Sequence, residues 1–222
     1  MPLGTVILSC HPERSEGSAV SRKMQIPRFA RDDKIKYHAG GATSTMNVSP
    51  NAGLRQVISA DQIQKRVREL GRQISDDYRG ETMIALGILE NSFLFMADLV
   101  RAVDVPLICS FIKPSYKQSQ QGESAVLEIL FSHELAIAGK HVLLVEGLVH
   151  SGVTSEYLMN DLRARGAASV KLVTLLDRQS ARRVPLQPDY FGFLVDDTFL
   201  CGYGLGSPEQ TGRNLPYLAA TV

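Results

Sequence analysis

The sequence lacks a CxxC pair, a long apolar run and an excess of charge of either sign, and each absence excludes a class of protein. Its three cysteines, Cys10, Cys109 and Cys201, are far apart, so neither a disulfide framework nor a cysteine zinc site is expected. No apolar stretch approaches the roughly 20 residues that cross a membrane, and no positive charge precedes the short apolar start, which argues against a signal peptide. A formal net charge of +1 over 222 residues gives no strong attraction to nucleic acid or to a membrane. We therefore expect a cytoplasmic protein that binds neither.

Residues 1 to about 50 lack the regular apolar spacing of helices and strands, and they are rich in Arg, Ser, Gly and Pro. This composition predicts a disordered tail over 1–50, either a plain flexible tail or a basic binding arm. A third interpretation is an over-extended reading frame with Met46 as the natural start, because the tail includes LSCHPERSEGSAVSRKMQIPRFARDD, which resembles translated interspersed-repeat DNA. The folded domain is expected over 51–222.

The domain alternates between helix-like and strand-like patterns. Ser59 and Gln62 form a capping box, in which two side chains satisfy free amides at the start of a helix. The apolar residues that follow recur at helical spacing: Ile63, Val67, Leu70, Ile74 and Tyr78. Apolar runs predict strands at 82–89, 106–113, 124–131, 140–147 and 169–177, and helical patterns cover 92–103 and 155–166. This alternation predicts an α/β fold with a parallel twisted sheet flanked by helices.

Ligands of parallel α/β sheets bind at the carboxyl ends of the strands. In this chain those ends lead into ILENS, EGLVHSGVT and DRQSARR, which are therefore the expected ligand loops. The polar segment PSYKQSQQGE lies between two strand patterns and has the composition of a flexible flap.

The loop after the strand at 140–147 has the composition of a phosphate-binding turn. Ser151, Gly152, Val153, Thr154 and Ser155 stand where this strand meets the next helix. Free amides and the helix dipole favour an anion there, and a monoester phosphate suits the small residues and hydroxyl groups. The alternative is that Thr154 or Ser155 only caps the helix. The loop has no Walker lysine, which excludes a nucleoside-triphosphate P-loop.

Several motifs occur together, in order, over residues 54–222. They are LLVEGLVHSGVT, LRARGAASVKLVTLLDRQSARR, PDYFGF and GYGL followed by RNLPY, and together they resemble the hypoxanthine-guanine phosphoribosyltransferases. The resemblance implies a small hood, a flexible flap, and transfer of 5-phosphoribosyl from phosphoribosyl pyrophosphate to a 6-oxopurine. It also implies Mg2+ as cofactor and a homodimer or homotetramer.

The resemblance implies a role for each of fifteen positions. These are Glu146 and His150 for catalysis, Ser151, Gly152, Val153 and Thr154 for the 5-phosphate, Arg178, Tyr190 and Phe191 for the purine, Glu90, Asn91 and Arg213 for pyrophosphate, Ser115 and Tyr116 for the flap, and Glu146 and Asp197 for the metal.

The sequence also departs from the family pattern. Glu90-Asn91-Ser92 stands in place of Lys-Gly-Gly, Gly147 and His150 replace acids, and Gly206 replaces an aspartate. His150 is either a general base with a pKa near neutrality or a solvated loop histidine. The departures favour an alternative function, a regulatory protein that binds purine nucleotide or phosphoribosyl pyrophosphate with impaired catalysis. A transferase for another base is a third interpretation. If the family mechanism holds, restoring aspartate at 147 and 150 should raise activity.

Overall fold

The protein is described by a computed structural model, which covers residues 22–25, 53–118, 125–131, 135–207 and 211–221. The central sheet has the strand order β1-β5-β4-β3-β6-β7-β8. Five neighbouring strands are parallel: β4 (Leu107–Gln118), β3 (Met83–Ile88), β6 (His141–Val149), β7 (Ser169–Asp177) and β8 (Tyr190–Leu194). At one edge β5 (Ala125–Phe131) and β1 (Arg22–Gln25) run antiparallel to their neighbours. The predicted α/β fold with a parallel sheet is confirmed.

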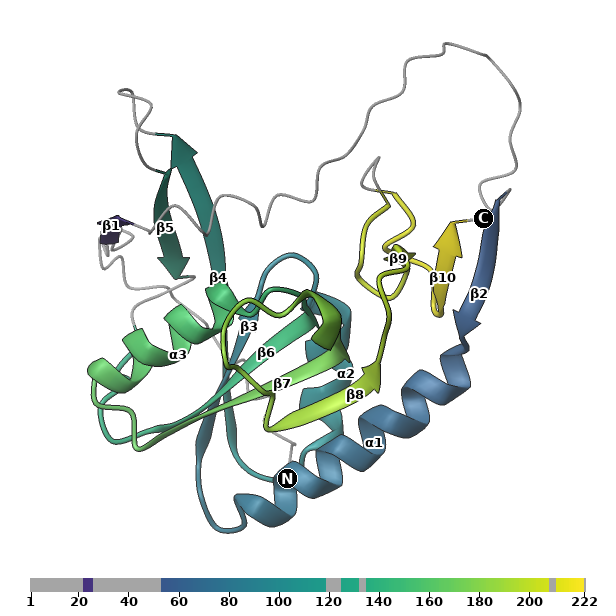
Figure 1. Cartoon of the computed structure of the whole chain (residues 1–222). Helices are drawn as coiled ribbons and strands as arrows, with labels where there is room; N and C mark the ends of the chain where they lie inside the picture. Colours follow the sequence, from purple (N-terminus) through teal and green to yellow (C-terminus); the bar gives the residue numbers. More distant parts are fainter. Residues whose placement is uncertain (1–21, 26–52, 119–124, 132–134, 208–210, 222) are drawn as a thin grey trace, which may run out of the picture.

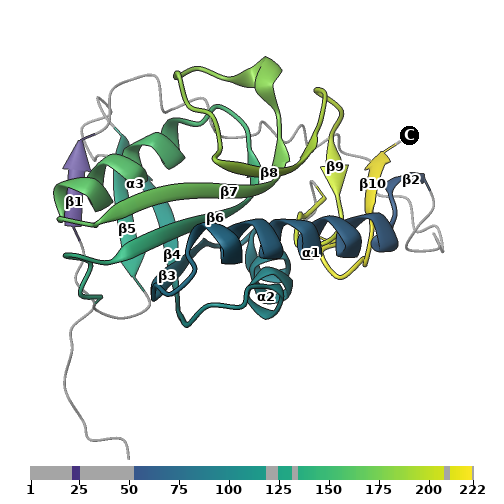
Figure 2. The ribbon, with the colours of Figure 1, turned by 90° about the horizontal axis from the view of Figure 1, so that it is seen from below.

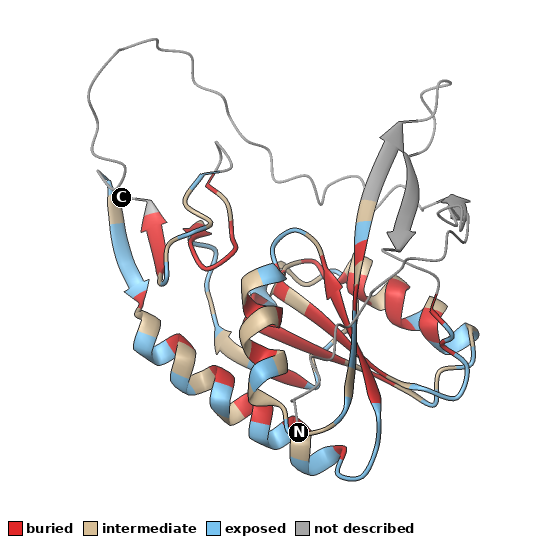
Figure 3. Ribbon diagram, turned by 180° about the vertical axis from the view of Figure 1, so that it is seen from behind, coloured by how far each residue is buried: buried red, intermediate tan, exposed pale blue. Residues whose placement is uncertain are grey.

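Helices cover both faces of this sheet (Figures 1 and 2). The helices α1 (Ala60–Asp77) and α2 (Phe93–Ala102) pack on one face, and α3 (Val153–Ala164) packs on the other. The central strands are buried between them (Figure 3), and every residue of β3 is buried. Such continuous burial explains why these strands read as apolar runs without alternation.

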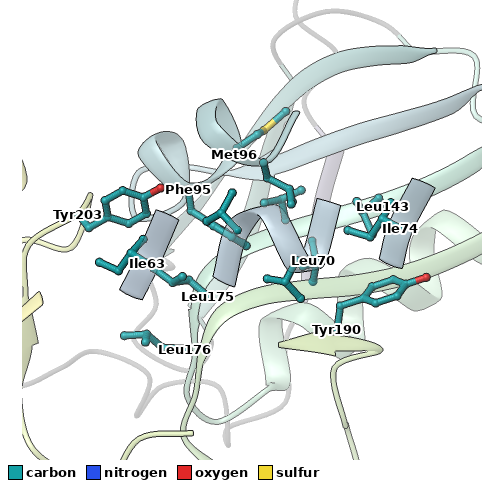
Figure 4. Packing of buried hydrophobic residues seen from close by; sticks show 14 of the residues in the cluster. Ile63, Leu70, Ile74, Phe95, Met96, Leu143, Leu175, Leu176, Tyr190 and Tyr203 are labelled. Carbon is teal, nitrogen blue, oxygen red and sulfur yellow. The ribbon is translucent and has the colours of Figure 1, made fainter. Parts of the chain in front are cut away.

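The start of α1 follows the capping pattern in its sequence. Ser59 Oγ accepts a hydrogen bond from the Gln62 amide at 3.2 Å, and Gln62 Oε1 accepts one from the Ser59 amide at 2.8 Å. The predicted apolar face is buried against the sheet: Ile63, Val67, Leu70, Ile74 and Tyr78. Figure 4 shows three of these residues, Ile63, Leu70 and Ile74. Both predictions for this helix are confirmed.

A second, three-stranded antiparallel sheet forms the expected small hood. It joins β2 (Leu54–Ile58) to β10 (Leu218–Thr221), and β10 to β9 (Leu200–Cys201). The start of the domain therefore lies beside its end (Figure 1). This pairing holds the segment that contains β9 above the carboxyl edge of the main sheet.

Two segments differ from the prediction. The strand β4 continues to Gln118 and pairs with β5, so Ser115 and Tyr116 lie in a strand opposite Glu128 and Leu127. The rest of the expected flap, 119–124, lies outside the described residues. Within the stretch expected to be a disordered tail, β1 pairs with β5, while the other tail residues, including Met46, also lie outside the described residues. No helix in the described part of the chain is long and apolar enough to cross a membrane.

Candidate active site

The predicted phosphate-binding turn joins β6 to α3. Gly152 is the N-cap of α3 and has a φ of 81°, a left-handed conformation that glycine adopts without a Cβ penalty. Ser151 is buried, and its Oγ accepts a hydrogen bond from the Val153 amide at 3.3 Å. Ser155 donates instead to Glu146 Oε2. The N-cap is thus Gly152, without a side-chain capping hydrogen bond, and not Thr154 or Ser155. The first turn of α3 therefore presents backbone amides at the carboxyl edge.

This turn lines a hollow of about 260 Å³ at the carboxyl ends of β3 and β6. Residues from the loop after β3, from β6 and from the start of α3 surround it. The lining residues are Ile88, Leu89, Asn91, Pro114, Glu146, Leu148, His150, Ser151, Gly152, Thr154 and Ser155. The structure therefore brings the two predicted catalytic residues, the predicted phosphate turn and Asn91 to one place.

The loop after β7 packs over the turn and holds it. Arg182 Nη1 donates to the His150 carbonyl at 3.2 Å, and the Arg183 amide donates to the Ser151 carbonyl at 3.0 Å. Arg182 is itself ion-paired with the buried carboxylate of Asp177. Sequence analysis did not single out Asp177 and Arg182, although both lie in the expected ligand loop DRQSARR. They act by fixing the turn, which only the packing reveals.

Arg178 is a buried cation beside the same turn, with 8% of its surface exposed. Its amide donates to the Val149 carbonyl at 3.0 Å, and its Nη2 donates to the Thr198 carbonyl at 2.7 Å. Its Nε is buried and has no hydrogen-bond partner among the described residues. A buried donor without a partner costs about 1–3 kcal/mol. Arg178 does not line the hollow, so a ligand acceptor such as a carbonyl oxygen reaches its guanidinium only after the side chain moves.

A charged cluster adjoins the hollow at Asn91, although its charged side chains do not line the hollow. Glu90 Oε1 accepts a hydrogen bond from Lys113 Nζ at 2.9 Å, and Glu90 Oε2 lies 3.6 Å from Arg213 Nη2. Arg213 Nη1 also donates to Asn91 Oδ1 at 2.8 Å. The hydrogen bond from Lys113 is the main cause that lowers the pKa of Glu90. The structure brings the three predicted pyrophosphate residues together and adds Lys113, which sequence analysis missed.

Gly147 is buried where the loop after β3 crosses β6. A Cβ added there would lie 2.4 Å from the carbonyl oxygen of Asn91, a separation that no side chain tolerates. A Cβ added at Gly204 would lie 2.9 Å from the same oxygen. The backbone of Asn91 is thus enclosed by two glycines.

The two predicted metal ligands lie in different hollows. Glu146 lines the hollow described above, whereas Asp197 lines a neighbouring one of about 370 Å³ and accepts a hydrogen bond from Ser180 Oγ at 2.7 Å. The described ranges contain no group of three or more His, Cys, Asp or Glu side chains that could hold a metal. Since Mg2+ takes six oxygen ligands, these residues do not fit a metal held by the protein alone.

The predicted purine contacts of Tyr190 and Phe191 need correction. Tyr190 is 3% exposed and packs in the core beside α1 (Figure 4), where its hydroxyl donates to Asp77 Oδ2. That hydrogen bond, followed by one from Lys171, lowers the pKa of Asp77. The Phe191 carbonyl accepts a hydrogen bond from Arg66 Nη2 at 2.7 Å. Both residues lie before the carboxyl end of β8, so neither reaches the hollow.

The core position of Tyr190 predicts that Tyr190→Phe changes stability and not ligand affinity. Loss of the hydroxyl leaves Asp77 and Lys171 without a shared partner, and we expect a decrease of about 1–2 kcal/mol in the free energy of unfolding. Ligand affinity should not change. Urea unfolding and calorimetric titration with guanosine monophosphate measure the two effects. Tyr78→Phe is the control, because the Tyr78 hydroxyl has only a 3.5 Å contact with Ser169 Oγ. A large loss of nucleotide affinity in Tyr190→Phe would show that the hydroxyl contacts the ligand and would contradict the core position of this side chain.

Comparisons with known proteins agree with this architecture. The family model for the phosphoribosyl transferase domain matches residues 56–208. A hypoxanthine-guanine phosphoribosyltransferase of Bacillus subtilis is 37% identical over 162 residues, which cover 73% of this chain and 89% of the relative. The structure of a hypoxanthine phosphoribosyltransferase from Staphylococcus aureus superposes with a TM-score of 0.71 at 31% identity, over 80% of this chain and 98% of that one.

A longer relative is also similar. The bifunctional protein TilS/HprT of Listeria monocytogenes is 36% identical over 199 residues, 89% of this chain. The chain spans only 29% of the length of that relative. From the matched domain, the identity to shorter relatives and the shared fold, we conclude that this chain belongs to the phosphoribosyltransferase family, among relatives of the hypoxanthine-guanine phosphoribosyltransferases.

Proposed function

We propose that this protein transfers the 5-phosphoribosyl group from phosphoribosyl pyrophosphate to hypoxanthine or guanine in purine salvage and releases pyrophosphate. One observation carries the proposal. A helix-start turn suited to a monoester phosphate lies next to a buried arginine whose Nε lacks a partner in the described structure. A purine nucleoside 5'-monophosphate has both matching groups, a phosphate and a 6-oxo acceptor.

Each residue near the hollow then has a role. The amides of Val153 and Thr154 bind the 5-phosphate, and Arg178 turns its guanidinium towards the ligand and donates to the 6-oxo group. His150, in the wall of the hollow, takes the proton from the purine nitrogen as it attacks the sugar carbon. Glu146 lies at the ribose side, where a carboxylate stabilises a cation-like transition state. The flap that contains Ser115 and Tyr116 excludes water.

Magnesium enters this proposal with the substrate. Mg2+ binds most readily to phosphate oxygens supplemented by one or two carboxylates, and Glu146 is the carboxylate that lines the hollow. When bound, the ion neutralises charge on the departing pyrophosphate. From the family resemblance we also propose a cytoplasmic homodimer or homotetramer, which sedimentation in solution would test.

A second candidate function is nucleotide binding in a regulatory role with catalysis impaired. The observation that favours it is the contact between Glu90 and Arg213, because a carboxylate on this arginine opposes a bound diphosphate. Both candidates share the monophosphate site and differ in turnover.

Nucleotide formation from phosphoribosyl pyrophosphate, Mg2+ and hypoxanthine, guanine or xanthine tests the proposal, together with titration of guanosine monophosphate. We expect slow turnover, and a loss of about ten- to a hundredfold in nucleotide affinity in Arg178→Met, since a buried hydrogen-bonded charge is removed. Affinity for ribose 5-phosphate should be unchanged. Arg163→Met is the control, because Arg163 is exposed on α3. Nucleotide binding without turnover would support the second candidate, and no binding at all would reject both.

A further inference from the structure

The loop between β3 and α2 places a carboxylate between two cations. The two oxygens of Glu90 contact different partners, Lys113 Nζ at 2.9 Å and Arg213 Nη2 at 3.6 Å. The hydrogen bond from Lys113 and its charge lower the pKa of Glu90, so the carboxylate is ionised at neutral pH. The two cations attract negative charge, so an anion of a ligand could take the place that the Glu90 carboxylate now occupies.

This position adjoins the phosphate turn. Leu89 and Asn91, the neighbours of Glu90 in the chain, line the same hollow as Ser151 and Gly152. Glu90 therefore lies in the chain between two residues that line the hollow, and its charge acts at the border of the phosphate turn.

The cation of Arg213 is held in place independently of Glu90. Its Nη1 donates to Asn91 Oδ1 at 2.8 Å and also to the Gly204 carbonyl. A Cβ added at Gly206 would lie 3.1 Å from the guanidinium, so this group lies close against the backbone. Removing the charge of Glu90 should consequently leave Arg213 where it is.

We propose that Glu90 determines ligand specificity, acting as an internal anion that weakens binding of a diphosphate and leaves the site selective for ligands with a single phosphate monoester. This proposal rests on the proposed function, which places the 5-phosphate of the ligand in the turn at Ser151–Thr154. A second anionic group must compete with Glu90 for Lys113 and Arg213, and it meets the repulsion of the carboxylate.

The exposure of these side chains limits how strongly Glu90 weakens diphosphate binding. The side chains of Glu90 and Lys113 are 55% and 54% exposed, so water and salt screen their contact. Arg213 is only 22% exposed. Glu90 can therefore be displaced, and it weakens diphosphate binding without abolishing it.

Calorimetric titration of the full chain and its Glu90→Gln variant with ribose 5-phosphate, pyrophosphate and phosphoribosyl pyrophosphate tests this proposal. We expect Glu90→Gln to bind pyrophosphate and phosphoribosyl pyrophosphate about tenfold more tightly at low salt, with less gain at high salt. Affinity for ribose 5-phosphate should stay the same. Glu81→Gln is the matched control, because Glu81 is 58% exposed and faces His141 at the opposite edge of the sheet.

The outcomes separate this proposal from the proposed function. Ribose 5-phosphate binding with no gain for pyrophosphate in Glu90→Gln would overturn the role of Glu90 and leave the function standing. If neither protein binds ribose 5-phosphate, the proposed function fails. In Glu90→Gln/Arg213→Gln the gain should disappear, and a gain that persists would show that Glu90 does not act through Arg213.

Discussion

Gly147→Asp is expected to destabilise the fold by about 2–5 kcal/mol instead of restoring activity. The new Cβ would lie 2.4 Å from the Asn91 carbonyl oxygen, and a backbone atom cannot move aside as a flexible side chain can. The added carboxylate would also be buried next to that oxygen, where two acceptors repel. Urea unfolding followed by circular dichroism measures the loss.

Two further variants separate the causes of that loss. Gly147→Ala has the steric clash without the charge, so it should account for the larger part. Gly80→Asp is the control, because nothing lies within 4 Å of an added Cβ there. Gly80 has a φ of +85°, so its variant should lose only the roughly 1–2 kcal/mol of a left-handed side chain. A Gly147→Asp protein as stable as the parent, with faster nucleotide formation, would support the expectation from the family resemblance and contradict the packing.

Gly152→Ala is expected to reduce affinity for ribose 5-phosphate by on the order of a hundredfold. At a φ of 81° alanine is strained, and its Cβ would lie 3.1 Å from Arg182 Cδ and from Val184 Cγ2. The side chains of Arg182 and Val184 must give way by a few tenths of an ångström. Because Arg182 also holds the turn through the His150 carbonyl, this displacement and the backbone strain together disturb the amides at the start of α3. Calorimetric titration measures the affinity.

Gly139→Ala is the control for this second variant. Gly139 has a φ of +71° and nothing within 4 Å of an added Cβ, so its variant shares the backbone strain but not the contacts. Equal, unchanged affinities in both variants would contradict a phosphate site at this turn. An equal decrease in stability with a loss of affinity only in Gly152→Ala would support it.

Local interactions made much of the fold predictable. The capping box at Ser59 and Gln62 and the apolar face of α1 depend on neighbours three or four residues away, which the sequence displays directly. The buried central strands were recognisable because both of their faces meet helices. The direction of β5 was not predictable, since an apolar run does not state which way its strand pairs.

In the candidate site, too, features that depend on adjacent residues could be predicted, and features that depend on tertiary packing could not. The turn at Ser151 and Gly152 could be recognised because its conformation depends on adjacent residues. Tyr190 was misplaced because motif order does not show how far along β8 a side chain lies or which layer it faces.

Sequence alone therefore determined the α/β class, the family resemblance and the position of the turn between β6 and α3, because each depends on local pattern or on motif order. Only the tertiary structure decided that Asn91 packs between Gly147 and Gly204, that Glu90 contacts Lys113 and Arg213, and that Arg178 is buried with an unpartnered nitrogen in the described structure. These contacts join residues far apart in the chain, so they exist only after the sheet has brought the strand ends together.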